Sequence, residues 1–344
     1  MNFSSDNSFG VADEVMAAVS AANQGAAASY GGDEWTARVH RRLAEVFECN
    51  VDILLVPSGT AANALSVATL TPAHGAVFCH DEAHILLEEC GAVEFYSNGA
   101  RLVPVGGFGG RMTPEGLKAA LGLYPGLRQD LIPSALSLTQ STECGTIYSA
   151  EDIAALCELA RSADLSVHMD GARFANAVAG LGAAPADITW RAGVDILSLG
   201  ATKNGAIAAE AIVVFKSSIG ADLVYRRKRG GLLLSKMRFI AAQLEAWLND
   251  DLWLRLAAHA NQMASQLADG LAQLPGISMP WPVEANEVFA VMPQSLADAL
   301  RASGGEFHDW TTRGLEAVSY THLTLPTTGI RWRSRGGGGA GSGG

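Results

Sequence analysis

The chain has 344 residues, of which 49% are hydrophobic and 17% are charged, and its formal net charge is −11. This length suits about two domains, and this composition is typical of a protein with a large buried core, which excludes an intrinsically disordered chain. The negative charge argues against a nucleic-acid partner, and no apolar run reaches the ~18 residues that a membrane-spanning helix requires.

Short apolar runs alternate with helical patterns from about residue 34 to residue 215. The predicted strands are Asp52–Val56, Ala76–Cys79, Arg101–Val105, Ala135–Thr139, Leu165–Met169, Asp195–Leu199 and Ala211–Phe215. The predicted helices between them include Thr60–Leu70, Thr113–Leu121 and Ser149–Ser162. This alternation predicts an α/β domain in which helices cover both faces of a mostly parallel, seven-stranded sheet.

The pattern changes after Gly231. A long helical pattern runs from Leu233 to about Gln273, and strands are predicted at residues 276–280 and 287–292. We therefore predict an N-terminal arm at 1–33, a large domain at 34–238 and a smaller α+β domain at 239–315. Residues 316–344 look foreign: the last nine have the composition of a flexible linker, and the piece before them looks like a cloning adaptor fused to a truncated gene. The alternative is a natural disordered terminus. In either case we expect this tail to lie outside the fold.

The five cysteines are scattered and include no C-x-x-C pair, and the first residues have neither the basic segment nor the apolar core of a signal peptide. Both observations predict a cytoplasmic protein with reduced thiols, each buried in the core.

Charged side chains follow two of the predicted strands. Asp170 and Arg173 come after Leu165–Met169, and Lys203 comes after Asp195–Leu199. The carboxyl ends of parallel strands share one edge of the sheet, where ligand sites form. A lysine that forms a Schiff base and an aspartate that binds a pyridinium nitrogen are what a pyridoxal-phosphate enzyme needs. The alternative is a helix cap and two ordinary surface cations.

The turn Pro57-Ser-Gly-Thr60 follows the first predicted strand and opens a helix. The backbone N–H groups at a helix start, together with the Ser58 and Thr60 hydroxyls, can bind a phosphate. Turns of this kind often only cap helices, but the position before the first crossover helix favours a phosphate site.

Three further motifs invite an assignment. His80 and His84 lie four residues apart, but the glutamate between them does not fit H-E-x-x-H, so we predict no metal there. One histidine, His84, suits stacking on a flat cofactor ring and proton transfer, whereas His80 is predicted to be a core residue. The run Gly106–Gly110 is predicted to be a turn, and the basic run Arg226–Arg229 to be a solvated face or a phosphate contact across a subunit interface.

These motifs together resemble the low-specificity L-threonine aldolases, including the phenylserine aldolases, which are fold-type-I pyridoxal-phosphate enzymes. The resemblance covers about Phe3 to Thr312 and rests on Ser5-Asp6, Tyr30-Gly-Gly-Asp33, Pro57-Ser-Gly-Thr60 with Asn63, His84 with Glu89, His168-Met-Asp-Gly-Ala-Arg173 and Thr202-Lys203-Asn-Gly205. It implies an aspartate-aminotransferase-like fold. It also implies the cleavage of L-threonine, L-allo-threonine or L-phenylserine-type 3-hydroxy amino acids to glycine and an aldehyde.

The resemblance implies catalytic roles for three residues. Lys203 would bind pyridoxal 5′-phosphate as a Schiff base, Asp170 would bind its ring nitrogen, and His84 would stack on the ring and take the proton of the substrate's 3-hydroxyl group.

It also implies roles in binding. Ser58, Gly59 and Thr60 would hold the phosphate, Arg173 would contact the ring oxygen or the substrate carboxylate, and Ser5 would contact that carboxylate. Since relatives are homodimers or homotetramers with shared active sites, Tyr30 and Arg229 would act in the neighbouring subunit's site.

One departure from the family leaves alternatives open. Relatives end with a strand that carries a carboxylate-binding arginine, and neither Arg331 nor Arg333 of the foreign-looking tail matches its context. The alternatives are another fold-type-I lyase that catalyses β-elimination, or a pyridoxal-phosphate-binding protein that the altered C-terminus makes inactive.

Overall fold

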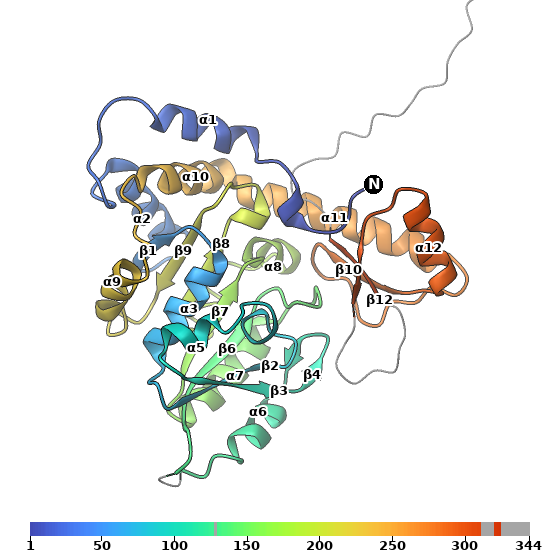
Figure 1. Cartoon of the computed structure of the whole chain (residues 1–344), viewed down its shortest axis with the longest axis horizontal. Helices are drawn as coiled ribbons and strands as arrows, with labels where there is room; N and C mark the ends of the chain where they lie inside the picture. The colour runs from blue at the N-terminus through green and yellow to red at the C-terminus, as the bar shows by residue number, and fades with distance from the viewer. Residues whose placement is uncertain (127–128, 311–319, 325–344) are drawn as a thin grey trace, which may run out of the picture.

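The computed structural model describes residues 1–126, 129–310 and 320–324 (Figure 1). A twisted central sheet is covered by helices, and a smaller sheet lies beyond the long helix α11 (Leu252–Ala272). The N-terminal segment contains the 3₁₀ helix η1 (Asp6–Ser8) and α1 (Asp13–Ala22), which packs on α10 (Arg238–Leu248).

The central sheet has seven strands in the order β1-β9-β8-β7-β6-β2-β3. Their bounds are β1 Asp52–Val56, β2 Gly75–His80, β3 Arg101–Val105, β6 Ile132–Thr139, β7 Ser166–Gly171, β8 Ile196–Gly200 and β9 Glu210–Val214. Six of these strands run in the same direction, and β9 runs antiparallel to them. The predicted mostly parallel, seven-stranded sheet is therefore confirmed.

Helices cover both faces of this sheet (Figure 1). The helices of the large domain are α2 Glu34–Val46, α3 Gly59–Leu70, α4 His84–Leu87, α5 Ala92–Tyr96, α6 Pro114–Leu121, α7 Ala150–Ser162, α8 Phe174–Leu181 and α9 Gly220–Arg229. Successive strand residues alternate between the two faces. Phe78 belongs to a core cluster that includes residues of α2, α6, α7 and α8, whereas Val77 belongs to a separate cluster with residues of α3, α4 and α5. This burial on both faces explains the continuous apolar runs of the strands.

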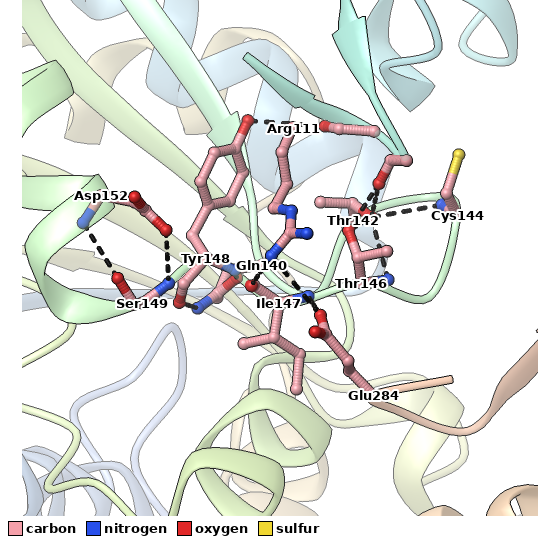
Figure 2. A network of polar contacts seen from close by, with 12 residues as sticks. Arg111, Gln140, Thr142, Cys144, Thr146, Ile147, Tyr148, Ser149, Asp152 and Glu284 are labelled. Atoms are coloured by element: carbon pink, nitrogen blue, oxygen red, sulfur yellow. Dashed lines mark hydrogen bonds and ion pairs between the residues drawn. The ribbon is translucent and has the colours of Figure 1, made fainter. Parts of the chain in front are cut away.

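Local sequence signals fix one helix cap and one turn, the predicted turn at the glycine run. Ser149 caps α7, because its hydroxyl accepts the N–H of Asp152 while the Asp152 carboxylate accepts the N–H of Ser149 (Figure 2). The glycine run forms a hairpin between β4 (Gly107–Phe108) and β5 (Arg111–Met112), with Gly109 and Gly110 at φ of 59° and 80°. A side chain at Gly107 would place its Cβ 1.9 Å from the Arg111 carbonyl oxygen, so only glycine fits there.

The C-terminal part differs from the prediction in two places. The predicted helix from Leu233 to Gln273 breaks into α10 and α11 around the 3₁₀ helix η3 (Asn249–Asp251), where Asp250 and Asp251 adopt left-handed φ values of 49° and 51°. Aspartate tolerates that conformation better than most residues, so a polar Asn-Asp-Asp step can end a helix without glycine or proline. The strand predicted at 276–280 is wrong, since only Ser278 forms an isolated bridge, to Val291.

The small sheet has three antiparallel strands in the order β10 (Glu287–Val291), β12 (Tyr320–Thr324) and β11 (His308–Trp310). The helix α12 (Gln294–Ala302) connects β10 to β11 along the chain. The strand predicted near 287–292 is thus confirmed.

Residues 316–319 and 325–344 of the predicted foreign tail lie outside the described residues. The prediction that this tail stays outside the fold is wrong for Tyr320–Thr324, which pairs with β10 on one side and β11 on the other. Its alternating Tyr, Thr and Leu residues favour a strand whatever their origin.

Two of the composition-based expectations can be compared with the structure. All five cysteines are free; Cys79, Cys144 and Cys157 are buried, but Cys90 is exposed, so the prediction of a core position is wrong for Cys90. Among the described residues no helix combines the length and apolar character needed to cross a membrane.

Candidate active site

A cavity of about 310 Å³ opens at the carboxyl edge of the parallel strands. Seven of the residues predicted from the sequence line it: Ser58, Gly59, Thr60, His84, Asp170, Arg173 and Lys203. They come from segments that follow β1, β2, β7 and β8, and these strands all end at the same edge of the sheet. This arrangement is the one that parallel topology imposes on ligand sites.

The helix that follows β1, α3, supplies an anion-binding turn. Ser58 is the N-cap of α3, in an extended conformation, and its hydroxyl accepts the N–H of Ala61 at 3.3 Å. The N–H groups of Gly59 and Thr60 belong to the first turn, where the helix itself provides no acceptor. Together with the positive end of the helix dipole they favour a bound anion.

Asp170 lies at the end of β7 and is 3% exposed. Its carboxylate accepts the Asn63 side-chain amide at 2.7 Å and the N–H of Ala172 at 2.9 Å. The same Asn63 amide donates to Glu89 at 2.9 Å, so one neutral side chain holds two buried carboxylates. A cationic group in the cavity would complete the environment of Asp170, because a buried carboxylate is costly without positive charge nearby.

His84 begins the short helix α4, and its ring faces the cavity. Ring atom Nδ1 lies 3.0 Å from Oε1 of Glu89. This hydrogen bond raises the pKa of His84, against an opposing effect of burial, and so makes the ring a stronger base near neutral pH. The backbone N–H of His84 donates to Glu143 at 2.7 Å.

Lys203 lies in the 3₁₀ turn η2 (Thr202–Asn204) that follows β8. Glu210, the first residue of β9, holds this turn: its carboxyl accepts the Thr202 hydroxyl at 2.5 Å and the N–H of Ala201 at 3.1 Å. Burial raises the pKa of Glu210 to about 7, although these hydrogen bonds and Lys203 oppose the shift. The turn that carries the lysine is therefore tied to β9 at its N-terminal end.

Arg173 joins three parts of the chain. Its guanidinium contacts Asp6 in the N-terminal segment at 2.8 and 3.3 Å and Glu287 at the start of β10 at 3.1 Å. Burial alone would raise the pKa of Asp6, but the cations Arg173 and Lys203 hold it below its usual range. Arg173 thus reaches the cavity as part of an ion-pair cluster that ties the small sheet and the N-terminus to the site.

Comparison with known proteins agrees with this geometry. The family model for beta-eliminating lyases matches residues 2–295. The low specificity L-threonine aldolase of Pseudomonas aeruginosa is 42% identical over 315 residues, which span 91% of this chain and 90% of that protein. The protein of the same name from Pseudomonas sp. strain NCIMB 10558 is 41% identical, over 91% of this chain and 90% of that protein. The chain belongs to the low-specificity L-threonine aldolase family, within the beta-eliminating lyases.

Solved structures show the same fold. The threonine aldolase of Leishmania major superimposes with a TM-score of 0.89 at 24% identity, covering 96% of this chain and 95% of that one. An aspartate aminotransferase from Rhodobacter sphaeroides gives a TM-score of 0.70 at 18% identity, covering 94% of this chain and 88% of that one. The predicted fold-type-I, aminotransferase-like architecture is confirmed. Membership of the aldolase family makes this protein a lyase.

Three predicted site residues lie away from the cavity wall of this aldolase-family chain. Ser5 caps η1 by accepting the N–H of Asn7, and it is Asn7 that lines the cavity. Tyr30 is 51% exposed, with the Lys228 ammonium 4.8 Å from its ring centroid. Arg229, at the end of α9, lines a separate surface cavity. Their predicted roles in substrate binding or in a neighbouring subunit's site stay predictions.

Sequence reasoning missed two carboxyl groups of the cavity wall, Glu143 and Glu210. Glu143 follows the predicted strand Ala135–Thr139, so the rule that located Asp170 would have located it as well. Glu210 begins the antiparallel strand β9 and reaches the cavity edge from the opposite direction. No periodicity in the sequence distinguishes that direction. His80 is buried as predicted, with Nδ1 accepting the N–H of Glu82 at 3.0 Å.

Proposed function

We propose that this chain is a pyridoxal-phosphate-dependent aldehyde-lyase. Its substrates would be L-threonine, L-allo-threonine or L-phenylserine-type 3-hydroxy amino acids, cleaved to glycine and an aldehyde. One observation carries the proposal: a helix N-terminus free to bind an anion, a buried carboxylate and a lysine line one cavity. The names of the two Pseudomonas relatives support the choice of reaction.

The residues present fit this cofactor. The first turn of α3 suits its phosphate, and Asp170 suits a protonated ring nitrogen, whose positive charge the buried carboxylate calls for. Lys203 offers the amine for covalent attachment. When bound, the cofactor supplies a conjugated ring that accepts the electron pair released as the Cα–Cβ bond breaks.

The side chains of the cavity supply the proton transfer. His84, made more basic by Glu89, takes the proton of the 3-hydroxyl group directly or through a water molecule while the Cα–Cβ bond breaks. The aldehyde leaves, and a proton returned to Cα completes glycine. Asp170 would keep the ring nitrogen of the cofactor protonated throughout. Its carboxylate therefore acts mainly at the stage at which Cα carries negative charge.

We further propose a cytoplasmic homodimer or homotetramer with shared active sites. The exposed positions of Tyr30 and Arg229 support sites completed by a second subunit, and five free thiols support a reducing compartment.

Product analysis tests the proposed reaction. Purified protein supplied with pyridoxal phosphate should absorb in the visible range, change its spectrum on addition of threonine or phenylserine, and release glycine from both substrates. A keto acid with ammonia would instead show β-elimination, and a spectral change without product would show a binding protein that does not turn over. Lys203→Ala is the control.

The attachment site can be tested separately. Borohydride reduction should abolish the colour and give a modified peptide that contains Lys203, and an adduct on Lys228 or Lys236 would contradict the site. His84→Phe keeps a ring for stacking but loses proton transfer, so kcat should fall by roughly 10²–10⁴-fold. Unchanged turnover in that variant would remove His84 from the mechanism.

A further inference from the structure

Glu143 connects His84 to the rest of the cavity wall. It lies in the loop between β6 and α7, and its atom Oε1 accepts two hydrogen bonds: one from the His84 backbone N–H at 2.7 Å and one from the Thr139 hydroxyl at 3.1 Å. The residue before His84, Ala83, is the N-cap of α4 and makes no side-chain cap bond. Glu143 therefore supplies from another element the cap that α4 lacks, at the residue whose ring faces the cavity.

The loop that carries Glu143 is held firmly on its other sides (Figure 2). Gln140 pairs with the backbone of Tyr148 through both ends of its amide, at 2.9 and 3.0 Å. The hydroxyls of Thr142 and Thr146 both donate to the Gly109 carbonyl, and Glu284 accepts the N–H of Ile147 at 2.7 Å. A loop fixed in this way can hold His84 in one position rather than follow it.

The second oxygen of Glu143 shows that the carboxyl is more than a cap. Atom Oε2 is buried and makes no hydrogen bond to the residues that the structure describes. A residue needed only as an acceptor for one N–H could be glutamine or asparagine, without the cost of placing a carboxyl group in a buried position. Burial and the nearby Asp170 raise the pKa of Glu143 to about 7, whereas the N–H and charge of His84 oppose the shift. The carboxyl thus changes charge near neutral pH, and it lies against the backbone of a histidine whose own pKa is raised.

Other ionisable groups surround the pair, and one of them, Asp170, acts on both members. Asp170 on β7 faces Glu143 and His84; Glu89 and Lys203 act on His84; Arg173 and the buried thiols of Cys79 and Cys144 lie in the field of Glu143. Glu89 holds the imidazole, and Glu143 holds the backbone of the same residue. The two carboxyl groups therefore constrain His84 from two directions.

We propose that Glu143 is a positioning residue that fixes His84 and, by its negative charge, sets the basicity of the imidazole. Carboxyl and imidazole then act as one coupled acid–base pair, in which ionised Glu143 favours protonated His84. This inference rests on the proposed function only for its kinetic consequence, because the coupling itself exists without turnover.

The test is a proton NMR titration of the His84 ring in the cofactor-loaded protein and in the cofactor-free protein, with the signal assigned through His84→Phe. Glu143→Gln keeps an oxygen acceptor for the His84 N–H but removes the charge. The pKa of His84 should fall by roughly half a unit to one unit. Glu88→Gln is the matched control, since it removes one carboxylate four residues after His84 from an exposed position outside the cavity and should leave that pKa unchanged.

Kinetics give the second measurement. Glu143→Gln should lower kcat by up to about tenfold with little change in KM, because the base is weaker while the binding residues remain. Thr139→Val removes only the second donor to Glu143 and serves if the glutamine variant does not fold. It should raise the pKa of Glu143. Because a neutral Glu143 no longer favours protonated His84, the acid limb of the kcat profile should move to lower pH.

Superimposable His84 titrations for the wild type and Glu143→Gln would overturn the inference and leave Glu143 as a loop residue only. An unmoved acid limb in Thr139→Val would overturn it as well. If the protein cleaves no 3-hydroxy amino acid, the proposed function fails, but the titration still decides whether the two groups are coupled.

Discussion

Asn63 offers the sharpest test of how the site is held together, because one buried amide holds two carboxylates. Its Nδ2 donates to Asp170 at 2.7 Å and to Glu89 at 2.9 Å, and all three residues are at most 5% exposed. Asn63→Ala removes both hydrogen bonds and leaves each carboxylate oxygen without that donor.

The expected cost follows from the charge on the acceptors. A hydrogen bond to a charged group contributes ~1.5–3 kcal/mol, and burying a polar group without its partner costs a similar amount. Two such bonds from one amide, with some relaxation around the smaller side chain, predict a loss of about 3–5 kcal/mol. For a chain of this size that corresponds to a fall in Tm of roughly 4–7 °C.

The chain offers a matched control on the same helix. Ser66 is also fully buried in α3, but its hydroxyl has no hydrogen-bond partner among the described residues. Ser66→Ala removes a buried polar atom without breaking a bond, so it should leave the free energy of unfolding unchanged or raise it slightly.

Urea unfolding at pH 8, followed at one protein concentration by far-UV circular dichroism and by tryptophan fluorescence, measures both variants. Coincident curves from the two probes are needed before a single free energy is assigned. A loss below about 1 kcal/mol in Asn63→Ala, or a loss equal to that in Ser66→Ala, would refute the view that this amide holds the two carboxylates.

Three further predictions concern other parts of the structure. Burial raises the pKa of Glu210 from its ordinary value of 4.5 to about 7 in the fold, so the stability that this group confers is full below pH 4.5 and is lost as the pH rises through 7. The free energies of unfolding from urea titrations at pH 5 and pH 8 should therefore differ by roughly 2–3 kcal/mol less in Glu210→Gln than in the wild type. An equal difference would contradict the assignment. Arg173→Lys loses the paired contact with Asp6, so hydrogen exchange of the N-terminal segment should accelerate. The free energy of unfolding should fall by about 2–4 kcal/mol. Unchanged exchange would show that the ion pair does not hold this segment. Truncation after residue 315 removes β12, whereas truncation after residue 324 keeps it. Because the loss of β12 exposes unpaired strand edges, the shorter chain should aggregate more in light scattering. Equal scattering from the two chains would mean that β12 adds nothing to the sheet.

Much of the large domain could be predicted from the sequence because its signals are local. Apolar runs buried on both faces marked the seven strands, and the strand end displaced furthest from its prediction is Ile132, by three residues. The same logic located Asp170 and Lys203, because each follows a strand and parallel strands end at one edge. The family resemblance added the relation of His84 to Glu89, which the structure shows as a 3.0 Å contact.

Other features depend on contacts between distant segments. The partners of Arg173 are Asp6, 167 residues earlier, and Glu287, on the small sheet, and no local pattern selects those carboxylates. The direction of β9 placed Glu210 at the cavity, and pairing with β10 and β11 placed Tyr320–Thr324 in a sheet from which composition had excluded it.

Within the large domain, sequence patterns were enough to locate the strands and the edge of the sheet that carries the chemistry, since burial periodicity and parallel connection act within short stretches of chain. The balance of charges in the site depends instead on contacts that only the folded chain makes. A buried carboxyl or guanidinium takes its ionisation and its hydrogen-bond partners from whatever the fold brings within a few ångströms, and for Glu143, Glu210 and Arg173 those neighbours come from several separate elements.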